Sequence, residues 1–155
     1  MSDSDYVYVT LIAAPPERVW EALTTAEFTQ QYWHATRVQS SFAVGENIEF
    51  LVDGEGGDEV GCEGTILEAN HPQRLSYTWH FPRNPEVRDE SPSRVTFTLE
   101  PVGQHTRLTV VHDQFPENSR VRPMISAGWP AVLAGLKTLL ETGAAVDFSM
   151  TGSAA

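Results

Sequence analysis

The chain has 155 residues, of which 41% are hydrophobic and 20% charged, and its formal net charge is −11. This size fits one domain with a genuine core, and no apolar run approaches the roughly 18 residues that a membrane span needs. An acidic surface repels phosphates, so the charge argues against nucleic acid and anionic membranes as partners.

The beginning of the chain predicts one strand followed by two helices. Residues 5–13 are largely β-branched or aromatic with a period of two, which is typical of a strand. Two prolines suit the first turn of a helix over residues 14–23, which has one apolar face. Residues 25–33 predict a second, shorter helix with Thr25 as its N-cap.

Residues 38–115 predict a series of strands joined mostly by short turns, at 53–59 and 70–73 for example. Short connections between successive strands favour an antiparallel meander. Residues 82–92 form a longer loop with three prolines, which we expect to be a mobile lip at the mouth of a pocket. Such a sheet buries one face and therefore needs a cover.

A leucine-rich final helix supplies that cover. Gly143 is expected to end this helix in the left-handed conformation, and Gly135 to let its backbone approach the sheet closely. Pro130 removes one helical hydrogen bond, so we expect a kink or a break between residues 126 and 130. Apolar residues at positions i, i+3, i+4 and i+7 form one stripe. The stripe consists of Ile125, Trp129, Val132, Leu133, Leu136, Leu139 and Leu140.

Three blocks of sequence carry a resemblance to a known family. They are residues 13–33, residues 64–81, and residues 106–119 taken together with 128–143. The third block is the most specific, because it joins a strand ending in histidine, a following phenylalanine, and a Gly-Trp pair that opens the leucine-rich helix. The chain resembles the START-like (SRPBCC) superfamily and, within it, the activator of heat-shock protein 90 ATPase homologues.

The resemblance implies an α+β, helix-grip (START-like) fold. In this fold a curved antiparallel seven-stranded sheet wraps around a long C-terminal helix, and two short helices follow the first strand. A short strand near residues 36–43 completes the sheet. We expect a single domain over residues 5–145, with a disordered N-terminus (1–4) and a flexible C-terminal tail (146–155).

The resemblance also implies a function. Members of the family bind hydrophobic small molecules or interact with a chaperone, and related branches of the superfamily catalyse cyclisation or aromatisation. We therefore expect a protein that binds a small hydrophobic or aromatic molecule without a cofactor, rather than an enzyme. Two alternatives stay open: a cyclase- or hydrolase-type enzyme that uses His112, and a chaperone-associated interaction module. Self-association as a homodimer also stays open.

The expected binding site is a wedge between the curved sheet and the last helix. Wide aromatic side chains can line such a wedge without filling it, and Tyr77, His112 and Trp33 would supply its polar groups. The alternative is that the same side chains pack into a solid core. The candidate ligand-binding residues are Trp33, Phe42, Phe50, Tyr77, Trp79, Phe81, Phe97, His112, Phe115, Trp129, Leu133 and Leu136.

His112 is a weak candidate for catalysis. It is in phase with Leu108 and Val110, which points it inward, where it could act as an acid or a base. The alternative is a buried histidine that a polar neighbour satisfies. Asp113 is adjacent on the same strand and points the opposite way, so a His–Asp dyad within this strand is not expected.

No metal site is expected. The five histidines lack paired ligand spacing, and the acidic segment 53–59 does not open a calcium loop with the required glycine and glutamate. Cys62 is the single cysteine and has no basic neighbour, so we expect inert packing. One cysteine forms no internal disulfide and the N-terminus lacks signal-peptide features, which makes the cytoplasm the expected location.

Overall fold

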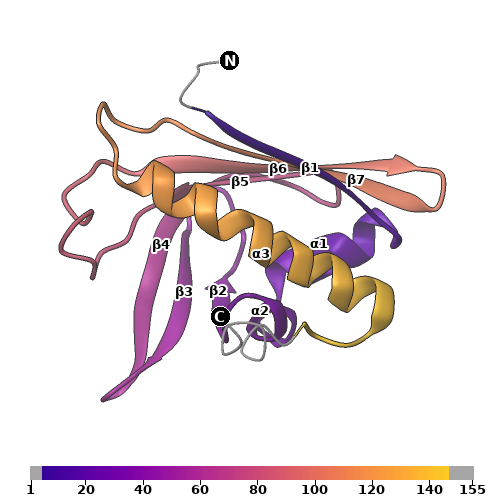
Figure 1. The fold of residues 1–155 in the computed structure, drawn as a ribbon, viewed down its shortest axis with the longest axis horizontal. Helices are drawn as coiled ribbons and strands as arrows, with labels where there is room; N and C mark the ends of the chain where they lie inside the picture. The colour runs from indigo at the N-terminus through magenta and orange to yellow at the C-terminus, as the bar shows by residue number, and fades with distance from the viewer. Residues whose placement is uncertain (1–4, 147–155) are drawn as a thin grey trace.

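The computed structural model describes residues 5–146, which fold into one antiparallel sheet and three helices (Figure 1). The sheet has seven strands in the order β1-β7-β6-β5-β4-β3-β2, which confirms the predicted helix-grip fold. The expected disordered N-terminus and residues 147–155 of the expected tail lie outside the described residues. The elements are β1 (Tyr6–Ile12), α1 (Pro16–Thr24), α2 (Ala26–Tyr32), β2 (Arg37–Ser40), β3 (Asn47–Gly54), β4 (Gly57–Asn70), β5 (Arg74–Trp79), β6 (Ser93–Val102), β7 (His105–Asp113) and α3 (Val121–Thr142).

Strands β2 to β7 follow one another across the sheet, and β1 pairs with β7 at the far edge. Every neighbouring pair is antiparallel, as the short turns predict. The period of two holds along β7, because Leu108, Val110 and His112 are all fully buried. The register shifts between β3 and β4 at Phe50 and Leu51, and between β4 and β5 at Ile66 and Glu68, and such bulges bend a sheet. In Figure 1, β3 and β4 accordingly turn away from the other long strands.

Helix α3 crosses the buried face of the sheet, and the α1–α2 pair lies against it (Figure 1). The predicted apolar stripe is confirmed, since its residues are buried except for Leu140, which is half-buried. Gly143 ends the helix as predicted: its φ is 80°, and its N–H donates to the Leu139 carbonyl at 2.8 Å. Within residues 5–146, none of the helices combines the length and the apolar character needed to cross a membrane.

Pro130 does not interrupt α3, so there is no break between residues 126 and 130, whereas the kink expected as the other possibility stays a prediction. The helix is continuous from Val121 to Thr142. Pro130 lies on the exposed side, whereas Trp129 and Leu133 anchor the turns around it in the core. Packing of the apolar face therefore compensates for the hydrogen bond that the proline removes.

Both ends of α3 are fastened to other elements. At its start, the Glu90 carboxylate accepts the backbone N–H of Arg120 at 2.7 Å, which places a negative charge at the positive end of the helix dipole. At its end, the Glu141 carboxylate accepts the backbone N–H of Ala13 at 2.8 Å and pairs with Lys137 at 2.6 Å. These contacts connect the helix to the loop 82–92 and to the segment after β1.

Thr25 occupies the N-cap position of α2, but its side chain does not cap the helix. The hydroxyl of Thr25 instead donates to the Glu21 carbonyl at 2.8 Å. The predicted cap is therefore absent for a local reason, because Thr25 directly follows α1 and its hydroxyl reaches back to the last turn of that helix.

Gly135 allows a close approach, but to α2 rather than to the sheet. A Cβ added at Gly135 would lie 3.2 Å from the carbonyl oxygen of Tyr32 and 3.3 Å from its Cβ. The expectation of a close helix–sheet contact is therefore wrong, since the early helices occupy that side of α3.

We expect Gly128→Ala and Gly135→Ala to change the free energy of unfolding by amounts that differ in sign or size. A Cβ at Gly128 would meet nothing within 4 Å, so alanine there should raise the free energy of unfolding by about 0.5–1 kcal/mol. At Gly135 the backbone of α2 would have to move, which should cancel or reverse this gain. Urea unfolding of the two variants measures the difference, and equal gains would contradict the close α2–α3 contact.

Candidate ligand-binding site

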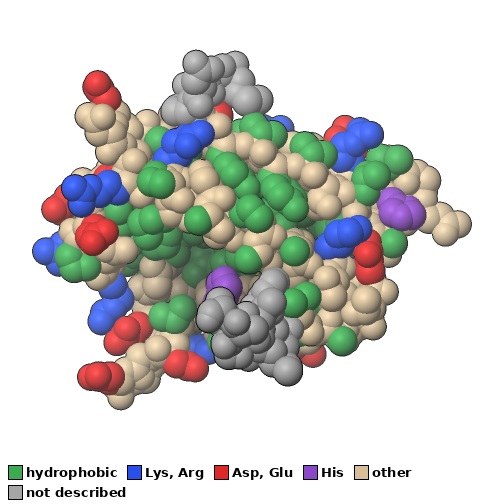
Figure 2. All heavy atoms as spheres, viewed as in Figure 1, with side chains coloured by type: hydrophobic (Ala, Val, Ile, Leu, Met, Phe, Trp, Pro, Cys, Tyr) green, Lys and Arg blue, Asp and Glu red, His purple; other side chains and the backbone are tan. Residues whose placement is uncertain are grey.

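An open hollow of about 190 Å³ lies where the N-terminal half of α3 meets the ends of α2 and β5. Figure 2 shows a depression among the hydrophobic side chains that gather on this side of the molecule. The surface of the hollow is mainly apolar. Its described lining residues are Trp33, His34, Trp79, Phe81, Met124, Ile125, Gly128, Trp129 and Val132.

Two local features of the sequence create the hollow. Gly128 falls on the lining face of α3 between Ile125 and Val132, and its missing side chain leaves space where a larger residue would project. At the end of α2, His34 and Ala35 adopt left-handed φ values of 50° and 59°. This turn ends the helix and leaves Trp33 and His34 on the wall opposite α3.

Three indole rings line the hollow. Trp33 and Trp79 stack with their centroids 6.2 Å apart and an interplanar angle of 16°. The ring of Trp129 lies 5.4 Å from Trp33 and 5.5 Å from Trp79. Flat aromatic walls of this kind suit a planar apolar molecule.

Behind the indoles the side chains pack into a closed core. Phe50, Tyr77 and Phe97 are at most 2% exposed and do not appear among the described lining residues. Their rings form a continuous row, 5.8 Å from Phe50 to Tyr77 and 5.9 Å from Tyr77 to Phe97. A solid core and a hollow thus occur side by side, and Tyr77 belongs to the core.

His112 is fully buried, and both of its ring nitrogens are hydrogen-bonded. The indole N–H of Trp129 donates to Nδ1 at 3.1 Å, and Nε2 lies 2.7 Å from the Ser93 hydroxyl. Because an indole nitrogen only donates, Nδ1 must be unprotonated, and the ring proton resides on Nε2. Burial lowers the pKa of His112 from 6.5 to about 3, although Asp113 opposes the shift. His112 is therefore neutral at physiological pH.

Among residues 5–146, the hydrogen-bond partners of the His112 ring are Ser93 and Trp129, and neither is a carboxylate. Asp113 points to the other face of the sheet, as predicted, and forms a two-bond pair with Arg94 at 2.9 and 2.7 Å. The ring of Phe115 stacks on the imidazole at 4.9 Å. His112 thus resembles a positioning element for Trp129 more than a free acid or base.

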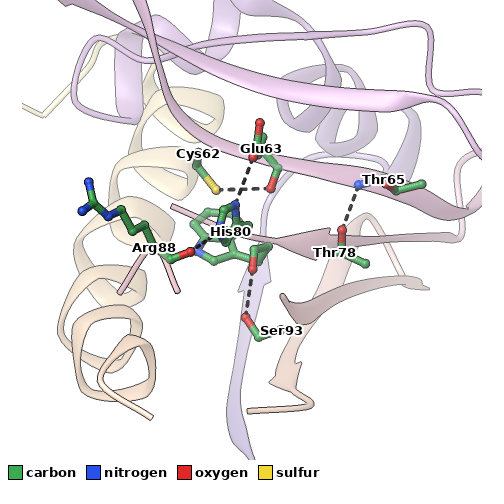
Figure 3. Close-up of polar contacts among 8 residues, drawn as sticks. Cys62, Glu63, Thr65, Thr78, His80, Arg88 and Ser93 are labelled. Carbon is green, nitrogen blue, oxygen red and sulfur yellow. Dashed lines mark hydrogen bonds and ion pairs between the residues drawn. The ribbon is translucent and has the colours of Figure 1, made fainter. Parts of the chain in front are cut away.

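A second hollow, polar and of about 280 Å³, lies where β4 and β5 separate. Figure 3 shows the polar contacts at this point, where the Thr65 N–H donates to the Thr78 hydroxyl at 2.9 Å. His80 Nδ1 lies 3.0 Å from the Glu63 carboxylate, and Nε2 lies 2.8 Å from the Arg88 carbonyl. These two contacts raise the pKa of His80, the Arg88 carbonyl most, against the opposing effect of burial.

His80 and Cys62, which lie at and beside this polar hollow, both make structural contacts. Both nitrogens of His80 are engaged, so the residue connects β5 to Glu63 and to the loop 82–92. Burial raises the pKa of the Cys62 thiol, as expected for inert packing. Among residues 5–146, no group of three or more His, Cys, Asp or Glu side chains is arranged to hold a metal ion.

The loop 82–92 is anchored rather than loose. Val87 is 1% exposed, the Arg88 carbonyl lies 2.8 Å from His80 Nε2, and Glu90 accepts the Arg120 N–H at the start of α3. No residue of this loop is among the described residues that line the apolar hollow. The expectation that it forms a lip there is wrong, because its long-range anchors direct it toward β5 and α3.

The family model described as Activator of Hsp90 ATPase homolog 1-like protein matches residues 13–141. The chain belongs to this family. Among functionally curated proteins, none matches the sequence.

Solved structures resemble this member of the Hsp90-ATPase-activator homologue family over most of its length. A crystal structure of a protein from Mesorhizobium loti is 28% identical, covers 88% of this chain and 96% of that chain, and has a TM-score of 0.72. The Aha1 dimer from Colwellia psychrerythraea is 19% identical over 90% of this chain and 97% of that chain, with a TM-score of 0.69. DynU16, from the dynemicin biosynthetic locus, is 22% identical over 93% of this chain and 49% of that chain, with a TM-score of 0.73.

Within this family member, only part of the predicted residue set surrounds the hollow. Trp33, Trp79, Phe81 and Trp129 line it. The others form the core around it or pack against it. They are Phe42, Phe50, Tyr77, Phe97, His112, Phe115, Leu133 and Leu136.

Five lining residues are absent from the predicted set. Ile125 and Val132 belong to the apolar stripe, so their proximity to the site could be found from its helical period. Gly128 carries a weaker signal, since a small residue on the buried side of a helix leaves room beside it. The sequence pattern gives no signal for His34 or Met124. The five missed residues are His34, Met124, Ile125, Gly128 and Val132.

Proposed function

We propose that this protein binds a small apolar or aromatic molecule in the hollow between α2, α3 and β5. The observation that carries the proposal is an open apolar hollow of about 190 Å³ walled by three indoles, beside an otherwise tightly packed core. An engineered apolar cavity of about 150 Å³ binds benzene. The volume therefore fits a molecule of one or two rings, below the size of a typical drug.

Family membership supports the proposal in a general way. One relative in fold, DynU16, belongs to the dynemicin biosynthetic locus, and a small-molecule role for this protein would agree with that. We also propose a cytoplasmic location, which the buried free thiol of Cys62 supports because it requires no oxidising compartment.

The two alternatives receive less support. An acid–base role for His112 would need a free ring nitrogen, whereas both nitrogens are hydrogen-bonded and the side chain is fully buried. A chaperone-associated role draws on the family description.

Filling the hollow should abolish binding. We expect tetralin, a two-ring hydrocarbon, to shift the indole N–H signals of Trp33, Trp79 and Trp129 in a two-dimensional NMR titration. The signal of Trp20 should stay in place, because this residue does not line the hollow. Gly128→Leu projects a side chain into the space and should remove these shifts.

Ala134→Leu is the matched control, because Ala134 is an exposed position of the same helix. This variant should bind tetralin as the unmodified protein does. Unaltered binding by Gly128→Leu, or an equal shift of the Trp20 signal, would contradict the proposed site.

A further inference from the structure

We propose that the molecule bound in the hollow carries a neutral hydrogen-bond acceptor, such as a ketone oxygen, which accepts the indole N–H of Trp79. This inference rests on the proposed function of the hollow and specifies the chemical class of its ligand. It predicts a one- or two-ring carbonyl compound rather than a plain hydrocarbon.

Trp79 is the exception in a structure that satisfies its buried polar groups. Within residues 5–146, its Nε1 is the single fully buried side-chain nitrogen or oxygen that has no hydrogen-bond partner. Other buried donors are paired: Trp129 donates to His112, and the Tyr32 hydroxyl donates to the Ala22 carbonyl at 2.7 Å. Because buried donors in proteins are normally paired, an unpaired one requires an explanation.

The position of Trp79 supplies that explanation. Trp79 is 6% exposed, and its ring forms part of the wall of the apolar hollow. Neighbouring side chains cover Nε1 itself, so a ligand must part them to reach it. The ring of Trp33 stacks on the ring of Trp79, and Trp33 lies at the end of α2 directly before the left-handed turn at His34 and Ala35.

The chemistry of the wall selects a neutral acceptor. An indole N–H donates and cannot accept, so the ligand atom that meets it must be an acceptor. None of the described lining residues is lysine or arginine, and the net charge of the chain is −11. A carboxylate or phosphate would lose its hydration without gaining a counter-charge, whereas a ketone oxygen loses little.

A pair of matched probes tests this inference. Tetralin and its ketone, α-tetralone, have nearly the same shape and differ by one acceptor. Both probes should shift the Trp79 indole proton signal when they bind, and we expect α-tetralone to move this signal further downfield than tetralin does in the unmodified protein. In Trp79→Phe, the ratio of α-tetralone affinity to tetralin affinity should fall about tenfold, which is the size expected for one buried hydrogen bond.

Trp20→Phe is the control variant, because Trp20 contacts His71 away from the hollow and its replacement should keep the ratio. An unchanged ratio in Trp79→Phe, or the same Trp79 proton shift with both probes, would overturn the inference and leave the hollow as a general apolar site. If neither probe moves the Trp33, Trp79 or Trp129 signals, the proposed function itself fails. The proton shift in the unmodified protein decides the matter even where Trp79→Phe folds poorly.

Discussion

Replacing Trp129 by alanine should lower the free energy of unfolding by about 3–5 kcal/mol. Trp129 is 3% exposed, and its ring contacts Trp33, Trp79 and Phe97. Its removal leaves a cavity at the centre of the aromatic cluster and also deprives His112 of the donor at Nδ1. Urea unfolding followed by circular dichroism measures the loss.

Trp129→Phe separates the two contributions. Phenylalanine keeps much of the ring but not the N–H, so we expect it to cost about 1–3 kcal/mol, mainly from the unpaired His112 nitrogen. A loss below about 1 kcal/mol for Trp129→Ala would mean that the ring lies in a space able to collapse, and it would contradict the central position described above.

The second large effect is a pH dependence that His112 imposes on stability. The pKa of His112 is about 3 in the folded protein and near 6.5 when unfolded. Between these values the unfolded chain binds a proton that the folded chain does not, so stability falls as the pH falls. Between pH 7.5 and pH 5.5 we expect the titration of His112 to lower the free energy of unfolding by about 1.4 kcal/mol.

The difference in slope between the unmodified protein and His112→Gln measures this contribution. Glutamine does not titrate, so the variant should lose less stability over that pH range even if it is less stable throughout. His80→Gln should act in the opposite direction. The pKa of His80 is raised by folding, so its contribution is present below pH 6.5 and is lost as the pH rises through the folded value. Parallel pH profiles for the unmodified protein and His112→Gln would contradict a neutral, buried His112.

The sheet and the covering helix could be predicted because both depend on local periods. Leu108, Val110 and His112 alternate over a strand, and Ile125, Trp129 and Leu133 recur at helical spacing, so their burial follows from the sequence. A sequence period does not reveal which side chain a residue contacts on another element across the core. Ser93 and Trp129 lie on other elements, and their contacts with His112 depend on strand register and helix position.

The lining of the hollow and the position of the loop 82–92 could not be predicted from the sequence. Aromatic residues were expected to line the wedge, yet most of them meet each other and close it. The space arises instead from an absent side chain at Gly128 and from the turn after Trp33. Prolines suggested a mobile loop, but Val87 and Glu90 anchor it through contacts with distant elements that no local pattern encodes.

The fastening of α3 at Glu90–Arg120 and at Glu141–Ala13 has a consequence for how binding can diversify. Because α3 is held at both ends, its distance from the sheet is fixed. The dimensions of the hollow beside it therefore depend on individual side chains rather than on movement of the backbone. Exchanges at a few positions such as 124, 128 and 132 can then enlarge, divide or seal this hollow while the scaffold stays the same.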